Sequence, residues 1–392
     1  MSYAFSPADV AYLRGPAGQA AVAEIAREPL TEASRLADVA RARALAGPMA
    51  AVVLETAMLR RKAALKLDGA ADWLFTDPAL QQATASPVAR HRALRLAGRD
   101  VHDVTCSIGA DLTVIAGVAG RCVGSDLDPV RLAMAQHNCA SAGVAPALLR
   151  ADALHPTSRD TVIVADPARR DEAGRRRWQP ADLLPRLDLL AEVYAGRDLA
   201  VKCSPGLDFA AVDWAQEIEL VSLDGTVREA CLWTGELAGT GITRRATVLR
   251  HDRLQWTITD ADPDDAPIRP VGAWLVDPDG AVVRAGLVRH YAVRHGLGQL
   301  DPRIAYLTGD APPPGIRAFR VLEHGKYSEK TLRSVLRSRS IGTLEILVRG
   351  LDVDPNTLRR RLKLAGAVSA TVVLTRIGDT PTAILCEAVR SE

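Results

Sequence analysis

Apolar residues recur every three or four positions through the first quarter of the chain. From Ser6 to about Gly98 the sequence is rich in Ala, Leu, Arg and Glu at this spacing, and Pro7 follows Ser6 as a helix-starting pair. The stretch PMAAVVLETAMLRRKAALKL keeps the same spacing. It closes with four cations that suit either a helix C-terminus or a phosphate contact: Arg60, Arg61, Lys62 and Lys66. The pattern predicts an all-α domain over residues 1–98.

After Arg99 the pattern changes to short β-branched runs separated by helical stretches. This alternation is typical of βαβ units around a parallel sheet with helices on both faces. The expected strands are 101–106, 121–126, 146–152, 161–166, 198–204 and 217–223, and the expected helices are 111–119, 129–143 and 181–196. Two later runs, 229–236 and 243–250, have short connections and could pair antiparallel at one edge. The pattern predicts an α/β domain over residues 99–258.

An acidic, proline-rich stretch, TDADPDDAPIRP, separates this domain from a third one and is typical of a linker. The third domain, 268–392, opens with two β-runs around an Asp-Pro-Asp-Gly turn at 277–280 and a helix over 286–296. It continues with strands 318–324, 343–350, 369–378 and 381–389 and helices 328–340 and 354–366. An α+β module is expected here.

Composition narrows the classes of protein and partner. A length of 392 residues suits two or three domains, and 48% hydrophobic with 24% charged residues is ordinary for a soluble globular protein. The net charge of +2 means that nucleic-acid binding would need local basic patches. Six scattered cysteines form no C-x-x-C pair, so neither a metal site nor a disulfide framework is expected. Without a signal-like N-terminus or an apolar run of about 18 residues, we expect a cytoplasmic protein that does not span a membrane.

Acidic residues stand at the ends of four consecutive expected strands. The first strand runs through Asp103 into the small turn CSIG, which would let a ligand approach the backbone and a helix N-terminus. Asp126 ends the second strand, where a carboxylate can accept both hydroxyls of a ribose, and Asp152 ends the third, placed for an adenine amino group. Asp166 ends the fourth. Single acids at strand ends are usually turn formers, but the ordered series favours a nucleoside site.

Residues 99–250 resemble the class I S-adenosylmethionine-dependent methyltransferases, whose sheet is Rossmann-like. Asp103 and Gly109 match the first motif of that family, Asp126 its ribose acid, Asp152 its adenine-side acid and Asp166 its catalytic motif. The resemblance implies S-adenosyl-L-methionine as the cofactor, held by Asp103, Cys106, Ser107, Gly109, Asp126 and Asp152.

Two further stretches resemble parts of RNA-modifying enzymes. FTDPALQQATASPVARHRA, residues 75–93, resembles the approach segment of trimethylguanosine-synthase-like RNA methyltransferases, and residues 343–366 resemble a THUMP-like module. Together these resemblances imply methyl transfer to RNA, tRNA or rRNA. Methylation of a protein or small molecule, and a silent RNA-binding assembly factor, remain alternatives; the oligomeric state is not predicted.

The methylated atom stays open among three chemistries. Amino-methyltransferases carry Asp or Asn, Pro, Pro and an aromatic residue at the fourth strand, whereas this chain has Ala168 and Arg169, so Trp178 or Phe75 would have to supply a ring. Arg169 would instead suit a substrate phosphate. Carbon-5 methylation would use Cys203 as a thiolate, although a buried inert cysteine is the more common case.

The third chemistry is methylation of a ribose hydroxyl. Asp166, Lys202 and Glu229 match by position three members of the Lys-Asp-Lys-Glu group that ribose methyltransferases use. The first lysine of that group is missing, although Lys62 or Lys66 could reach the site. We therefore name Asp166, Lys202 and Glu229 as candidate catalytic residues, with a structural ion pair as the alternative.

Basic residues cluster on two helices of the third domain. Arg333 and Arg337 lie four positions apart and share a helix face. Arg359 and Arg360 follow closely on a helix start at Asp354, where cations should gain nothing from the helix dipole. We expect these four arginines to bind RNA phosphates, with a solvated basic face as the alternative.

Overall fold

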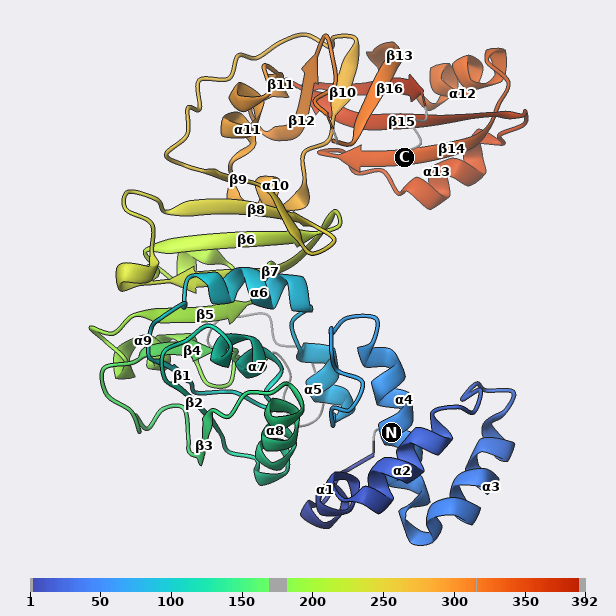
Figure 1. The fold of residues 1–392 in the computed structure, drawn as a ribbon. Helices are drawn as coiled ribbons and strands as arrows, with labels where there is room; N and C mark the ends of the chain where they lie inside the picture. Colours follow the sequence, from blue (N-terminus) through green and yellow to red (C-terminus); the bar gives the residue numbers. More distant parts are fainter. Residues whose placement is uncertain (1–2, 169–181, 315, 388–392) are drawn as a thin grey trace. The chain divides into compact units, whose positions relative to one another are not determined.

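The computed structural model describes residues 3–168, 182–314 and 316–387 (Figure 1). They form two compact units. Unit 1 comprises residues up to 243 together with 248–256, and unit 2 comprises 244–247 and 257 onward. Residues 1–98 and the α/β sheet fall in the same unit, and the domain boundary at residue 98 stays a prediction.

Helices make up the N-terminal part of unit 1, and no strand occurs among residues 3–98, as predicted. The helices are α1 (Pro7–Arg14), α2 (Pro16–Ile25), α3 (Arg35–Ala46), α4 (Ala50–Ala63), α5 (Asp77–Gln82) and α6 (Ser86–Leu94). A capping box starts α1: the Asp9 amide donates to Ser6 Oγ at 3.2 Å, and the Ser6 amide donates to Asp9 Oδ2 at 2.8 Å.

The helical run Arg35–Ala63 is long and apolar enough, by length and composition, to cross a membrane. Its 29 residues are broken by a turn of 3-10 helix at Gly47–Met49, and 39% of its most apolar stretch is buried inside the protein. Val52, Val53 and Leu59 belong to a hydrophobic core. A core helix of a soluble protein passes the same test, so this run is weak support for membrane insertion.

A nine-stranded sheet forms the centre of unit 1. Its strands lie in the order β3-β2-β1-β4-β5-β7-β6-β8-β9, with β3 and β9 at the two edges. Its strands are β1 (Val101–Asp103), β2 (Cys122–Asp126), β3 (Ala147–Arg150), β4 (Val162–Ala165), β5 (Leu199–Cys203), β6 (Glu217–Leu223), β7 (Thr226–Trp233), β8 (Arg244–Arg250) and β9 (Arg253–Thr259). Strands β1 to β5 pair in parallel, and β7 pairs antiparallel to β5 and β6. The predicted doubly wound class I methyltransferase sheet is confirmed.

Helices α7 (Ala110–Ala116), α8 (Pro129–Ser141) and α9 (Leu187–Val193) connect the parallel strands. The helix expected over 181–196 was placed too early: α9 begins at Leu187, because Leu184 pairs with Ala168 in an isolated antiparallel bridge before it. Strand β9 was not predicted, although Leu254, Trp256 and Ile258 alternate with polar residues along it.

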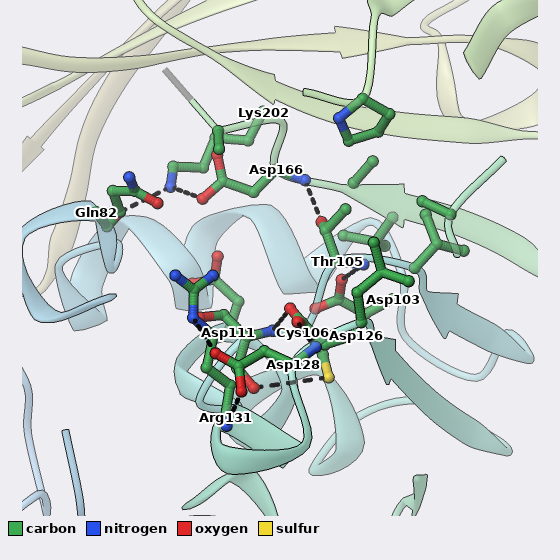
Figure 2. Close-up of a pocket in the computed structure, with 18 of the residues that line it drawn as sticks. Gln82, Asp103, Thr105, Cys106, Asp111, Asp126, Asp128, Arg131, Asp166 and Lys202 are labelled. Atoms are coloured by element: carbon green, nitrogen blue, oxygen red, sulfur yellow. Dashed lines mark hydrogen bonds and ion pairs between the residues drawn. The ribbon is translucent and has the colours of Figure 1, made fainter. Parts of the chain in front are cut away.

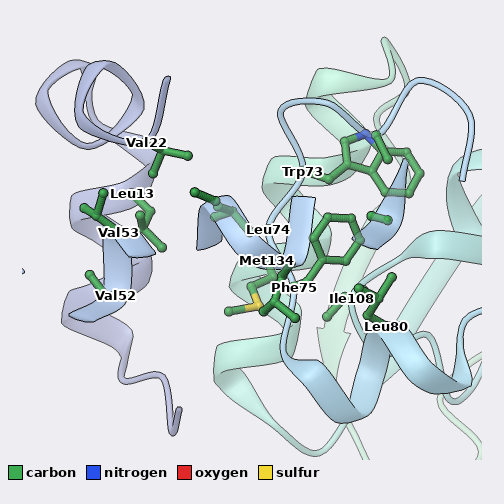
Figure 3. Close-up of a cluster of buried hydrophobic side chains, with 14 of the residues drawn as sticks. Leu13, Val22, Val52, Val53, Trp73, Leu74, Phe75, Leu80, Ile108 and Met134 are labelled. Carbon is green, nitrogen blue, oxygen red and sulfur yellow. The ribbon is translucent and has the colours of Figure 1, made fainter. Parts of the chain in front are cut away.

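One hydrophobic core joins the N-terminal helices to the sheet domain. Buried side chains from α1, α2 and α4 belong to the same cluster as Ile108, which follows β1, and Met134, which lies on α8 (Figure 3). Asn138 of α8 is fully buried beside this core: it accepts from the Leu74 amide at 2.7 Å and donates to the carbonyls of Leu74 and Ile108, both at 2.9 Å. The segment after α4 is therefore fixed to α8.

Unit 2 contains a seven-stranded sheet in the order β11-β12-β10-β13-β16-β15-β14. Its strands are β10 (Trp274–Val276), β11 (Gly298–Asp301), β12 (Ile304–Gly309), β13 (Ala318–Lys326), β14 (Ile341–Arg349), β15 (Val368–Ile377) and β16 (Thr380–Glu387). Its helices are α10 (Gly280–Ala285), α11 (Val288–Arg294), α12 (Glu329–Ser338) and α13 (Pro355–Leu362). The predicted α+β class of this module is confirmed, although β11 and β12 were not predicted.

Two expectations for unit 2 were wrong. The second β-run around the Asp-Pro-Asp-Gly stretch is helix α10, because Asp279 caps it by accepting from the Ala281 amide at 2.8 Å. Helix α13 is only eight residues long, since Lys363 adopts a left-handed φ of 49° and ends it. Arg359 and Arg360 consequently lie in its last turn, where the helix dipole does favour cations.

Candidate active site

A cavity of about 520 Å³ opens where β1 to β5 end (Figure 2). Ligands of open α/β sheets bind beyond the carboxyl ends of the strands, and cavities of a few hundred Å³ suit small molecules. The acids Asp103, Asp126, Asp152 and Asp166 all line it, as do Cys106, Ser107 and Lys202. The structure thus brings together most of the residues named from the sequence.

Asp103, the last residue of β1, is nearly fully buried at the floor of this cavity. Its Oδ1 accepts from the Thr105 amide at 3.1 Å. Burial, with a smaller contribution from the nearby carboxylates of Asp111 and Asp166, raises the pKa of Asp103 to about 8 in spite of that hydrogen bond. At neutral pH this carboxyl group is therefore largely protonated and can donate a hydrogen bond.

Asp126, the last residue of β2, is held by two backbone amides. The Ser107 amide donates to Oδ2 at 3.0 Å and the Asp128 amide to Oδ1 at 2.9 Å. Ser107 reaches this position with a left-handed φ of 50°. Burial raises the pKa of Asp126 above its usual range. Each oxygen keeps capacity to accept a further bond, which the two hydroxyls of a ribose require.

The other residues named for cofactor binding differ in their contact with the cavity. Asp152 lines it and accepts from the Leu154 amide at 2.9 Å. Cys106 also lines it, with a thiol whose pKa is raised by burial. Gly109 is not among the described residues that line it: its φ is 78°, and an added Cβ would lie 3.2 Å from Ala135 of α8. Gly109 thus makes room for α8, and its part in cofactor binding stays a prediction.

Lys202 of β5 forms an ion pair with Asp166, the residue that follows β4, on one wall of the cavity (Figure 2). The lysine Nζ also donates to the Gln82 carbonyl at 3.0 Å, and the Asp166 amide donates to Thr105 Oγ1 at 2.7 Å. Burial alone would lower the pKa of Lys202, but the carboxylates of Asp166, Asp111 and Glu229 outweigh it and the pKa is raised. Lys202 is therefore an ammonium group that positions Asp166, not a base.

Glu229 contacts a residue that the sequence analysis did not single out. Arg92 of α6 donates to both oxygens of Glu229, at 2.8 and 2.9 Å, and forms an ion pair with Asp111 Oδ2 at 2.8 Å. Asp111 Oδ1 is buried without a hydrogen-bond partner among the described residues. Nothing in the local sequence distinguishes a buried arginine in α6 from its exposed neighbours.

The alternative chemistries find mixed support in the geometry. Cys203 is buried and is not one of the described residues lining the cavity, so the thiolate route lacks access. Phe75 lies in the helical core and cannot stack on a base in the cavity. Lys62 pairs with Asp77 at 3.3 Å, and Lys66 donates to two carbonyls at the end of α5. Arg169 and Trp178 lie outside the described residues.

The C-terminal arginines are not equivalent. Arg333 is half-buried, pairs with Glu329 at 2.8 Å and donates to the Arg361 carbonyl at 2.7 Å. Arg337, Arg359 and Arg360 are exposed. Arg333 thus helps to hold unit 2 together, whereas the side chains of the other three arginines are accessible to a ligand.

The polar side chains that line the cavity fit a nucleoside that carries a cationic sulfonium group. Carboxylates suit the hydroxyl and amino donors of adenosine, and the carboxylates of Asp111 and Asp166 suit a positive charge. Among residues 3–168, 182–314 and 316–387, no cluster of three or more His, Cys, Asp or Glu side chains is arranged to hold a metal ion. None of the six cysteines forms a disulfide.

Comparisons with known proteins agree with this geometry. Uncharacterized S-adenosylmethionine-dependent methyltransferases from two strains of Mycobacterium tuberculosis, CDC 1551 and H37Rv, are each 56% identical to this chain over 345 residues. The alignment spans 86% of this chain and 95% of each relative. In fold, the chain is similar to the crystal structure of a candidate methyltransferase from Porphyromonas gingivalis W83, with a TM-score of 0.73, 19% identity and coverage of 99% and 100%.

Two segments match described sequence families. Residues 316–388 match the THUMP domain-like family, in agreement with the resemblance of residues 343–366. Residues 6–63 match a family described only as a domain of unknown function, DUF8688.

Proposed function

The chain belongs to the S-adenosylmethionine-dependent methyltransferases, and we propose that it transfers the methyl group to RNA, either tRNA or rRNA. The observation that carries this proposal is the THUMP-like module at residues 316–388 in the same chain as the methyltransferase sheet. Its exposed Arg337, Arg359 and Arg360 supply cations of the kind that bind RNA phosphates. The six cysteines form no disulfide, which suits the reducing cytoplasm, where we place the protein.

In this proposal the strand-end acids divide the cavity into two sides. Asp126 accepts from the ribose hydroxyls and Asp152 from the adenine amino group, while the turn from Cys106 to Gly109 shapes the floor. Asp166 and Lys202 form the side that faces the acceptor. Arg169 stays a proposed contact for the substrate.

Bound S-adenosylmethionine supplies a methyl group made electrophilic by its sulfonium charge. The acceptor's nitrogen or oxygen lone pair bonds to that methyl carbon as the sulfur–carbon bond breaks, and the bonding electron pair stays on sulfur. The acceptor's own proton passes to the carboxylate of Asp166 or to water. Lys202 keeps Asp166 oriented by the ion pair and, being an ammonium group, can also donate to an acceptor oxygen.

Transfer of a radiolabelled methyl group tests the proposal. The purified chain is incubated with labelled S-adenosylmethionine and total RNA from cells that lack the gene, and the RNA is then digested and its nucleosides are identified by mass spectrometry. We expect one methylated nucleoside that is absent from the untreated RNA. Label found in protein or small molecules but not in RNA would contradict the proposal, and RNA binding without any transfer would favour an assembly factor.

A further inference from the structure

A second cavity, of about 550 Å³, adjoins the first within unit 1. Gln82, Ala83 and Lys202 line both cavities, so the two meet beside the Lys202–Asp166 ion pair. The second cavity extends from there between the segments around Lys66 and Thr84 and the turn that joins β6 to β7. It is large enough for one nucleotide unit.

A β-bulge directs Arg228 into this second cavity. Consecutive residues of β6, Val221 and Ser222, pair with Glu229 and Val227 of β7, so Arg228 is the extra residue between them. In a regular strand Arg228 and Glu229 would face opposite sides of the sheet, yet both line the cavity. Bulges that re-aim a side chain are over-represented next to active sites.

The acidic side chains of the second cavity already have partners. Glu229 is bound by Arg92 on both oxygens, Asp68 pairs with Arg90 at 2.7 Å, and Asp224 accepts from the His251 amide at 2.9 Å. Arg228 and the His251 side chain are exposed at the cavity wall. The cavity therefore offers an exposed guanidinium at one end and a buried ammonium, Lys202, at the other.

We propose that this second cavity binds the acceptor nucleotide of the RNA, with Arg228 on its phosphate and its reactive group beside Lys202 and Asp166. A guanidinium recognises phosphate by two parallel hydrogen bonds, and a nucleotide anchored in this way reaches the junction of the two cavities. This inference rests on the proposed function, since it names the part of the RNA that the site holds. Arg228 acts here as a specificity-determining residue for a phosphate-bearing acceptor.

Steady-state methylation of total RNA from cells lacking the gene tests this assignment with three variants. For Arg228→Ala we expect kcat/KM for RNA to fall about tenfold or more, chiefly through KM, because the variant cannot form the charge-assisted hydrogen bonds to the phosphate. The salt dependence of RNA binding should also become shallower by about 0.7 in slope, the value for one neutralised phosphate on a single strand. Arg228→Lys should restore the slope, and part of the affinity.

Arg159→Ala is the matched control, since Arg159 is exposed just before the start of β4, whereas the first cavity opens where the parallel strands end. It should leave KM and the salt slope unchanged. Binding of S-adenosylhomocysteine, measured by calorimetry, should be unchanged in all three variants and shows that each is folded.

The outcomes separate this inference from the proposed function. If the wild-type chain methylates RNA and Arg228→Ala matches it in KM and salt slope, the second cavity does not hold the acceptor phosphate, although the enzyme is an RNA methyltransferase. If the wild-type chain methylates no RNA, the proposed function fails, and the nucleotide assignment of the cavity fails with it.

Discussion

Arg92 Nη1 donates to both carboxylate oxygens of Glu229, at 2.8 and 2.9 Å, with both side chains at most 3% exposed. The same guanidinium binds Asp111 of α7, so one residue of α6 is tied both to β7 and to the helix that follows the turn after β1. Burial by itself would lower the pKa of Arg92, but the carboxylates raise it, and the guanidinium stays charged. Glu229 is thereby part of a structural cluster as well as a neighbour of Lys202.

Arg92→Met should destabilise the protein strongly. Removing one partner of a buried ion pair leaves uncompensated carboxylates, at a cost of about 3 to 5 kcal/mol in the free energy of unfolding. Arg90→Ala on the same helix is the control: Arg90 pairs with Asp68 at the surface, so its loss should cost about 1 kcal/mol or less. Urea unfolding of both variants measures the difference, and equal costs would show that the Arg92 cluster contributes little stability.

Asp126→Ala should weaken binding of S-adenosylhomocysteine about tenfold or more. The carboxylate that would bind two ribose hydroxyls supplies charge-assisted hydrogen bonds, each worth about 1.5 to 3 kcal/mol. Calorimetry measures the affinity. Asp188→Ala, which removes an exposed acid paired with Arg186, should bind as the wild type does. Unchanged affinity in a folded Asp126→Ala protein would remove Asp126 from the cofactor site.

Asp166→Ala should abolish methyl transfer while leaving affinity for S-adenosylhomocysteine nearly intact, because Asp166 is expected to face the acceptor. Lys202→Met should also lose most of its activity, since Asp166 then loses the ammonium that orients it. Cys203→Ser should stay active, because this buried cysteine lies outside the cavity lining. Kinetics and calorimetry on the three variants decide: an inactive Cys203→Ser protein would restore the thiolate route.

Stability should depend on pH through Asp103. Its pKa is about 8 in the folded protein and about 4 in an unfolded chain, so its contribution is full below about pH 4 and is lost as the pH rises through about 8. Asp103→Asn cannot ionise, so its free energy of unfolding should fall less between these two pH values. Urea titrations of both proteins across this range measure the fall. Parallel curves would show that Asp103 ionises normally.

Replacing Arg337, Arg359 and Arg360 together by Ala should weaken RNA binding and flatten its salt dependence, by about 0.7 in slope for each phosphate that is no longer neutralised. Affinity for S-adenosylhomocysteine should be spared, since the cofactor cavity lies in the other unit. Arg320→Ala is the control, because Arg320 pairs with Glu387 at 3.5 Å on the sheet of the same unit. A salt slope equal to that of the wild type would contradict a role for these arginines.

The sequence was most informative where a local pattern has a single structural outcome. Short β-runs that end in acids placed Asp126 and Asp166 at strand ends, and the parallel sheet then brought those ends to one cavity. The Asp-Pro-Asp-Gly stretch has two outcomes, a hairpin turn or a helix cap, and the apolar run after it suited either. In the structure Asp279 acts as the helix cap, and the run is α10.

The residues that the sequence missed depend on contacts between distant segments. Arg92 and Glu229 are 137 positions apart, and no local pattern marks an arginine that will be buried. Arg228 lines its cavity because of a bulge, which shifts the pairing of β7 with β6 by one residue. The sequence of β7 does not mark the position of this bulge. The close approach of Ala135 of α8 to Gly109 is another contact between distant segments that the sequence does not mark.

The three hydrogen bonds of Asn138 limit how the N-terminal helices could be exchanged for those of another protein. Because Asn138 satisfies the backbone of Leu74 and of Ile108, a chimera that exchanged the N-terminal helices for those of another protein would leave buried polar groups unpaired. A transplant would succeed only if the facing surface of α8 travelled with the helices. The helical part is thus joined through α8 to the turn that follows β1, and it is not an interchangeable attachment.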